Sequence, residues 1–357
     1  MFSATSILTF IVVLGIIVVF HEFGHYLVAR MCGVQVKTFS VGFGPKLLSK
    51  KVGPTEYCLS ALPLGGYVRM LGDDPNEEIP AEDRPYAFLA QPVRKKIAIV
   101  LAGPLFNILL AIMIYSGIFM IGFPTLTAVV GEIHEGSAAE QGGLQPGDRI
   151  LRIGDREITL WEDIRETVQK SEGSALLFVV DRNGEQVSLD ITPRMKETED
   201  AFGEKHAQWL IGILPSGDHI TKRFNPLKAV YLGTLETGQK SVLIVVSIAK
   251  MIQGKLSADN LGGPIMIAQI VGEQASQGML NIVSFVAALS INLGLINLFP
   301  IPVLDGGHLV FFSIEGILGR PLSLKKMEIA QQVGLFLIVS LMVFAMYNDF
   351  IRFFVSP

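Results

Sequence analysis

Two histidines and a glutamate stand in the pattern H-E-x-x-H at residues 21–25, inside the apolar run IVVLGIIVVFHEFGHYLVAR. On a helix, His21 and His25 share one face, so both imidazoles can reach one Zn²⁺ ion. Glu22 lies one step round the helix and can act on a water at the metal without being a ligand. Ionisable groups inside a membrane span are costly and mark functional sites. The pattern therefore predicts a zinc site at membrane depth.

A catalytic zinc site needs a third protein ligand beside its open position. His134, His206 and His219 belong to a segment expected on the far side of the membrane, away from the H-E-x-x-H motif. Asp305, in NLGLINLFPIPVLDGGHLVFF, has the most apolar surroundings of any carboxylate in the chain. It also lies at the cytoplasmic end of another predicted span, at the same membrane depth as the two histidines. We expect Asp305 to be the third ligand, and the alternative is a residue that caps the next helix.

Several polar residues accompany this set. His308 is expected behind the ligands or at an interface, and not as a fourth ligand. Asn297 either joins helices or holds a substrate carbonyl near the metal, while Asn107 in AGPLFNILLA is expected to join helices. Two prolines and two glycines are expected to break the helix around Asp305 and free backbone groups: Pro300, Pro302, Gly306 and Gly307.

The composition indicates which elements carry these residues. Half of the 357 residues are hydrophobic, 17% are charged, and the mean hydropathy is +0.47. A soluble domain carries roughly a quarter of charged residues. Cys32 and Cys58 are too few for a disulfide scaffold, so both are expected as reduced thiols. The fold class predicted is a polytopic α-helical membrane protein.

Four apolar stretches are long enough to cross a bilayer, which takes about 20 residues. They lie at about 5–28, 97–121, 279–303 and 328–347. The first is expected to be retained, because it lacks the basic start and the cleavage site of a signal peptide. A fifth stretch at 241–252 has 12 residues and follows Glu236 and Lys240. This length suggests an amphipathic helix on the membrane surface.

The charges between the spans predict the orientation. Residues 29–96 contain ten Lys and Arg against seven acids, and the connection 305–327 is also basic. The positive-inside rule places these two segments in the cytoplasm and both termini outside. Residues 122–220 contain 9 basic and 18 acidic residues. A segment of this length can cross as a folded domain regardless of its charge.

Two segments outside the spans are expected to fold. Residues 122–200 alternate strands, Gly-rich turns and a helical stretch, and Asn183-Gly184 marks a hairpin turn, which predicts a small α/β domain. Residues 201–278 then form a connector that holds the surface helix. On the cytoplasmic side, TEYCLSALPLGGYVRMLG (55–72) is strand-like, with Gly65-Gly66 in its middle. It is expected to form a β-hairpin dipping toward the membrane.

The motifs HEFGH, AGPLFN, GYVRMLG and NLFPIPVLDGG, with a PDZ-like domain at 122–200, resemble the bacterial site-2 protease family, closest to its regulator-of-sigma-E branch. The resemblance implies an intramembrane zinc endopeptidase with His21, His25 and Asp305 as ligands and Glu22 as base. It also implies that Asn297 and a membrane-reentrant β-loop contact substrate. The further residues expected there are Pro300, Pro302, Gly65, Gly66, Tyr67 and Val68. One departure is that well-known members carry two tandem PDZ domains, and this chain has one.

The resemblance further implies the location and the partners. We expect a multi-pass protein of the bacterial inner membrane, with its site near the cytoplasmic face and the PDZ-like domain outside. Substrates would be single-span membrane proteins trimmed first by another protease, such as pre-cleaved anti-sigma factors or remnant signal peptides. A peptide ligand of the PDZ-like domain is a further expected partner, and nucleic acid is not. The expected reaction is hydrolysis within transmembrane segments.

Two other function classes compete with this interpretation. A membrane-anchored zincin that cuts soluble proteins would take its third ligand from a soluble helix after the motif, and 29–96 offers no suitable residue. A PDZ-bearing adaptor or a metal transporter would not cut peptides. A transporter should carry polar groups through the depth of several spans, whereas here they gather at one end. The variant Glu22→Gln separates the classes, because it should abolish only peptide cleavage.

Overall fold

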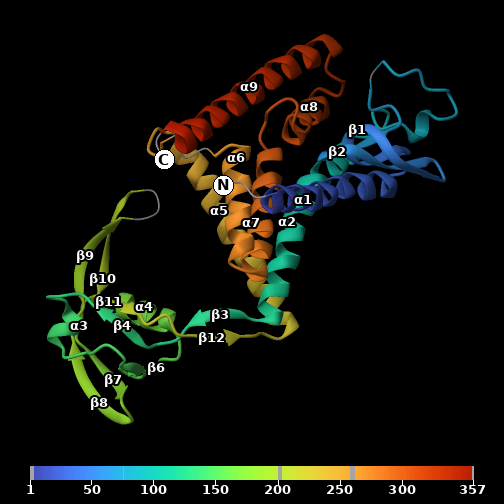
Figure 1. Ribbon diagram of the computed structural model, residues 1–357. Coiled ribbons are helices and arrows are strands. Elements are labelled where there is room, and N and C mark those ends of the chain that lie inside the picture. Colours follow the sequence, from blue (N-terminus) through green and yellow to red (C-terminus); the bar gives the residue numbers. More distant parts are fainter. Residues whose placement is uncertain (1–3, 75, 200–202, 258–261, 356–357) are drawn as a thin grey trace. The chain divides into compact units, whose positions relative to one another are not determined.

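The computed structural model describes residues 4–74, 76–199, 203–257 and 262–355, and the chain forms two compact units (Figure 1). The first unit, here called the membrane unit, combines Met1–Ile118 with Pro226–Pro357. The second, here called the α/β unit, is Phe119–Asn225. The α/β unit is thus inserted into the membrane unit, as the sequence predicts.

The membrane unit is mainly helical. Its elements are α1 (Ala4–Met31), β1 (Val36–Val52), β2 (Thr55–Met70), a 3₁₀ turn (Arg84–Tyr86), α2 (Val93–Ile121), α5 (Pro226–Ile252), α6 (Pro264–Ser276), α7 (Met279–Asn297), α8 (Asp305–Leu318), α9 (Leu324–Phe350) and a terminal π-helical turn (Ile351–Val355). Four helical stretches of the described residues are long and apolar enough to cross a membrane: Leu8–Met31, Val93–Ile121, Met279–Asn297 and Leu324–Phe353, the last of which runs from α9 into the π-helical turn. The predicted polytopic membrane protein is confirmed.

The third span ends earlier than predicted. The sequence suggested 279–303, but α7 stops at Asn297. Pro300 and Pro302 explain the difference, because proline disfavours helical backbone at the residue before it and removes a helical donor. Asp305 is therefore the first residue of α8 and not the end of a span, and Leu304 takes the capping position.

The predicted surface helix at 241–252 is also corrected. It is the second half of α5, which runs for 27 residues from Pro226. Its buried residues are Ala229, Gly233 and Thr237, and a Cβ at Gly233 would come within 2.7 Å of the Ser116 backbone nitrogen of α2. α5 also packs against α7 (Figure 1). Its length therefore no longer argues for a position on the membrane surface, and the following helix α6 was not predicted.

Helix α2 lies against both α1 and α7 through small residues. A Cβ on Gly24 of α1 would come within 2.8 Å of the Ala102 carbonyl carbon, and one on Gly294 of α7 within 3.0 Å of the Pro104 carbonyl oxygen. Small residues at such points let helix backbones approach closely. This packing brings the H-E-x-x-H face of α1 directly against α2.

The predicted hairpin at 55–72 is larger than expected. Residues 55–70 form one long strand, β2, which pairs with β1, and the turn lies between Val52 and Thr55. Residues 38–41 of β1 pair on one side with 66–69 and on the other with 56–59. They are therefore central, and the stretch 66–70 lies at an edge. β2 also contacts α1, so this edge comes close to the H-E-x-x-H motif.

The α/β unit has two short helices among many strands. Its elements are β3 (Phe123–Leu126), β4 (Val130–Ile133), α3 (Ala138–Gln141), β5 (Arg149–Ile153), β6 (Arg156–Glu157), α4 (Trp161–Lys170), β7 (Leu176–Arg182), β8 (Glu185–Ile191), β9 (Arg194–Glu199), β10 (Lys205–Leu210), β11 (Ile213–Pro215) and β12 (His219–Lys222). A four-stranded sheet has the order β6-β5-β7-β8. Ile150, Phe178 and Val180 of this sheet are fully buried. Full burial of such a side chain contributes roughly 1.5–3 kcal/mol.

The hairpin predicted at Asn183-Gly184 joins β7 to β8. Arg182 pairs with Glu185 across it, and both turn residues have positive φ, 55° and 91°. A two-residue turn of the hairpin type requires this conformation at both positions, which favours Asn-Gly. The sequence signal is confirmed here because it depends on local backbone sterics alone.

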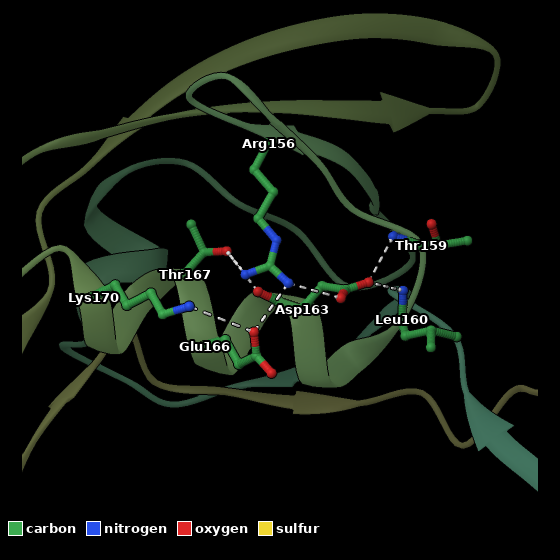
Figure 2. A network of polar contacts seen from close by, with 7 residues as sticks. All are labelled: Arg156, Thr159, Leu160, Asp163, Glu166, Thr167 and Lys170. Carbon is green, nitrogen blue, oxygen red and sulfur yellow. Dashed lines mark hydrogen bonds and ion pairs between the residues drawn. The ribbon is translucent and has the colours of Figure 1, made fainter. Parts of the chain in front are cut away.

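Polar contacts hold α4 against the sheet (Figure 2). The Arg156 guanidinium of β6 binds Asp163 at 3.1 Å and Glu166 at 3.0 Å, both on α4. Asp163 also accepts the backbone N–H groups of Thr159 and Leu160, which lead into the helix. These contacts satisfy donors at the helix start. They fix α4 as one wall of the α/β unit.

The domain boundary predicted at 200/201 is displaced. β11 pairs with β4 and β12 pairs with β3, so residues up to Asn225 belong to the α/β unit. The Phe224 N–H donates to the Phe119 carbonyl at 3.0 Å. The unit therefore begins and ends at neighbouring points. The pattern search missed these strands because their partners lie about 80–100 residues earlier.

Candidate metal centre

Three predicted ligands meet at one point. The Nε2 atom of His21 lies 3.1 Å from Oδ2 of Asp305, and Nε2 of His25 lies 3.5 Å from Oδ1. One donor atom from each residue falls within 4.8 Å of the others. Both histidines are 7% exposed. Helices α1 and α8, far apart in the sequence, thus converge on a single buried cluster.

The donor atoms fit a metal ion. Nε2 of His21 and Nε2 of His25 point at one another across 3.3 Å. Oδ2 of Asp305 is buried and has no aligned hydrogen bond within the described residues, despite its proximity to His21. Two facing imidazole nitrogens and one orphaned carboxylate oxygen are the donor types that zinc binds. A cation between them would satisfy all three.

The orientation of His25 is set by α2. Its Nδ1 donates to the backbone carbonyl of Ile99 at 2.8 Å, and a carbonyl can only accept. The proton of the neutral ring therefore sits on Nδ1, which leaves the Nε2 lone pair facing the cluster. Backbone carbonyls hold metal-binding histidines in this way in many sites.

A glycine of α2 makes room for both rings. A Cβ on Gly103 would overlap Nε2 of His25 and come within 2.9 Å of Cε1 of His21. Any side chain at this position would therefore occupy the space of the donor atoms. The close approach of α1 to α2 and the orientation of both rings depend on this residue.

The start of α8 is shaped by two glycines. A Cβ on Gly306 would overlap the carbonyl of Phe299, and one on Gly307 would lie 2.6 Å from Cα of Pro302. The chain between the two helices therefore folds back over the first turn of α8. The sequence predicted that Gly306 and Gly307 break a helix, but they lie inside α8. Their lack of side chains is what permits the tight return.

Charges and burial act together on Asp305. Burial opposes its ionised form, but the imidazoles of His21 and His25 outweigh burial and hold the pKa of Asp305 well below its usual range. Burial lowers the pKa of His308, one turn further along α8. At neutral pH the Asp305 carboxylate is ionised and the His308 ring is neutral.

A buried ion pair fixes α8 against α2. The Lys96 ammonium lies 2.6 and 2.7 Å from the two carboxylate oxygens of Glu315 and 5.0 Å from the centre of the Phe312 ring. The Lys96 side chain is 2% exposed. Lys96 lies in the first turn of α2, and Glu315 lies on α8 ten residues after Asp305. The pair therefore sets the direction of the helix that carries Asp305.

A cavity of about 680 Å³ surrounds the cluster. Nine of the predicted site residues line it: His21, Glu22, His25, Gly65, Gly66, Tyr67, Val68, Asn297 and Asp305. His308, expected behind the ligands, also lines it, whereas Pro300 and Pro302 are not among the lining residues. The backbone carbonyl of Pro302 packs against Gly334 of α9. The structure brings most of the predicted site to one place.

The edge of β2 meets Glu22 in this cavity. The Val68 N–H faces the Glu22 carboxylate, and the Met70 N–H donates to Oδ2 of Asp73 at 2.9 Å. A Cβ on Gly66 would come within 3.2 Å of Cγ of Glu22. Two outward N–H groups of this strand thus face carboxylates. Gly66 allows the strand to lie this close to α1.

Several site residues were missed by sequence reasoning. Asn107 was expected to join helices, but its Nδ2 lies 3.2 Å from Nδ1 of His21. Its link to α7 runs through the backbone, where the Ser290 hydroxyl donates to the Asn107 carbonyl. Asp73, for which no role was predicted, also lines the cavity. The four-residue spacing of Gly103 and Asn107, which puts them on one face of α2, is the sequence signal that could have predicted their contact with the site.

Comparison with known proteins identifies the family. The model of peptidase family M50 matches residues 9–341, which is nearly the whole chain. The chain belongs to peptidase family M50, the site-2 protease family. This confirms the predicted resemblance and excludes a non-enzymatic adaptor or transporter as the family function.

Similar proteins occur in several bacteria. A protein of Agrobacterium fabrum with the provisional name of zinc metalloprotease is 40% identical over 97% of both chains. The regulator of sigma E protease of Haemophilus influenzae is 31% identical over 97% of this chain and 99% of its own length. That alignment spans 447 positions, about 100 more than this chain contributes. The extra length is that of one small domain.

The family and the fold together establish the general activity. M50 peptidases are zinc metalloproteases, and this chain has four helices suited to cross a membrane. The protein is therefore a polytopic membrane protein and a zinc-dependent peptide hydrolase. Zinc is its metal, and the cluster on α1 and α8 has the donor set that zinc requires.

Proposed function

We propose that this M50 peptidase cuts peptide bonds within transmembrane segments of single-span proteins at the His21–His25–Asp305 cluster. The single observation that carries the proposal is the meeting of these donors, from α1 and α8, in a cavity that also holds Glu22 and the edge of β2. The substrates would be proteins already trimmed by another protease, such as anti-sigma factors or remnant signal peptides. The reaction would belong to regulated intramembrane proteolysis.

The residues divide the chemistry among them. His21, His25 and Asp305 would hold zinc, which lowers the pKa of water toward 7 and polarises a carbonyl. Glu22 lines the same cavity and would take the proton of the attacking water. It would then return this proton to the leaving amine. Asn297 lines the cavity from α7 and would hold the substrate carbonyl.

Substrate would bind as an added strand. A transmembrane helix has all its interior backbone groups bonded, so the scissile segment must unwind and find new partners. The 66–70 edge of β2 offers outward donors at Val68, which faces Glu22, and at Met70, which binds Asp73. A substrate strand would replace both carboxylates, as in other strand-addition complexes. Release from Val68 would free Glu22 for the water.

The α/β unit would select substrates. A groove of about 520 Å³ lies between α4 and the 209–214 segment, lined by Ile164 and Val168 and by the cations Arg165, Arg194 and Lys196. A PDZ-like groove with this lining suits a peptide whose end is anionic. A plain steric plug is the alternative. In both cases we place the unit outside the cytoplasm and both termini with it, in the bacterial inner membrane.

The decisive experiment uses Glu22→Gln and Asp305→Ala. Each is co-expressed with a panel of single-span proteins, and loss of full-length product is scored. Glu22→Gln should lower cleavage by about 10²–10⁴-fold, as general-base loss does, with zinc content unchanged. Asp305→Ala should lose zinc. Near wild-type cleavage by Glu22→Gln would remove Glu22 from its role, and undiminished zinc in Asp305→Ala would remove Asp305 from the site.

A further inference from the structure

Asn107 is a fully buried amide that the mechanism above does not use. It is 0% exposed and lies on α2, one turn after Gly103. Its Nδ2 is 3.2 Å from Nδ1 of His21, and its Oδ1 has no hydrogen-bond partner among the described residues. An amide oxygen left without a partner inside a protein is costly, by about 1–3 kcal/mol. Its position beside a metal ligand suggests a role.

The two nitrogens of His21 have different neighbours. Nε2 faces the cluster, 3.3 Å from His25 Nε2 and 3.1 Å from Oδ2 of Asp305, whereas Nδ1 faces Asn107. A neutral imidazole carries one proton, and the other nitrogen holds a lone pair. If Nε2 binds the metal, the proton must sit on Nδ1. Nδ1 then needs a hydrogen-bond acceptor, but the NH₂ group of Asn107 that faces it is a donor.

A half-turn of the amide resolves this conflict. The oxygen and nitrogen of an Asn side chain have nearly the same shape, and their assignment rests on the hydrogen-bond network. Exchanging them moves no heavy atom and places the oxygen 3.2 Å from Nδ1 of His21. One end of the amide lacks a partner in either orientation. The choice is therefore decided at His21.

We propose that Asn107 is a positioning residue whose side-chain oxygen accepts the Nδ1 proton of His21 and thereby holds Nε2 free for zinc. The inference rests on the proposed ligand set. It matches the arrangement at His25, where the Ile99 carbonyl accepts the Nδ1 proton. Helix α2 thus fixes the protonation of both histidines without supplying a ligand. Partners of this kind typically change metal affinity by 10–100-fold.

Zinc affinity of the purified full chain in detergent tests the proposal, measured by competition with a chelating dye. Asn107→Leu removes the acceptor at nearly constant volume and should weaken zinc binding by about 10–100-fold. Asn107→Asp keeps an acceptor and should bind zinc as tightly as wild type or more tightly. Ser290→Ala is the matched control, since it removes a contact of the Asn107 backbone between the same helices and leaves His21 untouched. It should bind zinc as wild type does.

Three results would overturn the proposal. They are wild-type affinity in Asn107→Leu, an equal loss in Asn107→Asp, and an equal loss in Ser290→Ala, which would show a role in helix packing alone. If Asn107→Leu does not fold, Asn107→Ala replaces it with the same expected loss. Failure of the ligand set itself is separate, because Asp305→Ala would then keep zinc, and that outcome overturns both proposals. Loss of zinc in Asp305→Ala with full affinity in Asn107→Leu overturns only the role of Asn107.

Discussion

Helix α2 carries none of the proposed ligands, yet it touches both histidine rings. The Ile99 carbonyl holds Nδ1 of His25, Asn107 faces Nδ1 of His21, and Gly103 leaves the space in which both rings lie. Rings whose Nδ1 atoms are already bound lose little conformational freedom when a metal binds, so the site is organised before binding. The chemistry of a motif on one helix is thus prepared by its neighbour.

Gly103→Ala should impair the metal site. Its Cβ would overlap Nε2 of His25, and helix backbone surrounds the position, so either the ring or the helix must shift. We expect zinc affinity and cleavage to fall together, by at least the 10–100-fold that disturbance around a metal ligand brings. Dye competition and cleavage assays measure the two.

Gly117→Ala provides the control on the same helix, because a Cβ there meets nothing within 4 Å. It should bind zinc normally and be slightly more stable, since alanine favours a helix by about 1 kcal/mol over glycine. A Gly103→Ala protein with normal zinc affinity would show that the rings do not need this space.

Spacing and burial cost predicted from the sequence which residues the structure brings together. His21, Glu22 and His25 follow from one helical turn, and Asp305 from its apolar surroundings. Gly103 and Asn107 could not be assigned in the same way. Their contact with the rings depends on how α1 packs on α2, and no local pattern encodes that packing. The sequence also did not predict that the chain between α7 and α8 folds back over Gly306 and Gly307, for the same reason.

At the level of elements, α8 is held at two points. Its first residue is Asp305, and ten residues later Glu315 binds the buried Lys96. Ten residues of helix span about 15 Å. The ion pair therefore acts as a distant anchor that sets where Asp305 points.

Lys96→Met should destabilise the protein strongly. It leaves the carboxylate of Glu315 without its partner, and breaking a buried pair in this way costs about 3–5 kcal/mol. The double variant Lys96→Met with Glu315→Met should recover most of this loss, because no charge is then left buried. Thermal unfolding in detergent measures both proteins. Arg94→Met, at an exposed position on the same turn, should change stability little; an equal loss there would contradict the role of the pair.

Met70→Pro tests the strand-addition proposal. It removes an edge donor that now binds Asp73 and does not touch Glu22. Cleavage should slow while zinc content stays normal, because a strand added to this edge loses a hydrogen bond. Met70→Leu is the matched control for packing and should cleave normally.

The substrate gives a complementary test of the same edge. A helix-breaking residue placed near the cytoplasmic end of a poorly cut span should speed its cleavage. If Met70→Pro leaves cleavage unchanged and the helix-breaking residues in the substrate do not speed it, β2 lines the cavity but does not bind substrate as an added strand.

Element prediction failed where charge or Gly and Pro interrupt an apolar run. Lys240 and Glu236 hid the first half of α5, although Ala229 and Gly233 pack it along its neighbours. β1 contains two glycines, a proline and four lysines, and it forms a strand through its pairing with β2. Contacts with residues distant in the sequence override the local secondary-structure preference in both cases: helix packing for α5 and strand pairing for β1.

At the scale of the whole molecule, the α/β unit enters and leaves through neighbouring residues. β3 pairs with β12, and the Phe119 carbonyl accepts the Phe224 N–H. A short Gly-Ser linker from Ile118 to Pro226 can therefore replace the unit. We expect this protein to cut shortened substrates as wild type does and to accept substrates with large outside domains. Paired substrates with and without a bulky folded domain measure the change.

Two controls sharpen this experiment. Loss of cleavage of shortened substrates, with normal zinc content, would contradict a purely selective role of the unit. In the intact chain, Arg165→Glu reverses a charge in the groove, whereas Lys170→Glu changes the same helix outside it. Altered selectivity in the first variant alone identifies a peptide reader. No change in either variant identifies a plug.

The distance between the ligands along the chain also has a consequence in time. With the proposed set, His21 and His25 emerge early in synthesis, and Asp305 follows 284 residues later. At about 5–20 residues per second, that delay is on the order of 15–60 s. With these ligands, a nascent chain would therefore have no complete zinc site, and could not cut its membrane neighbours, until synthesis has passed Asp305, in about the last seventh of the chain.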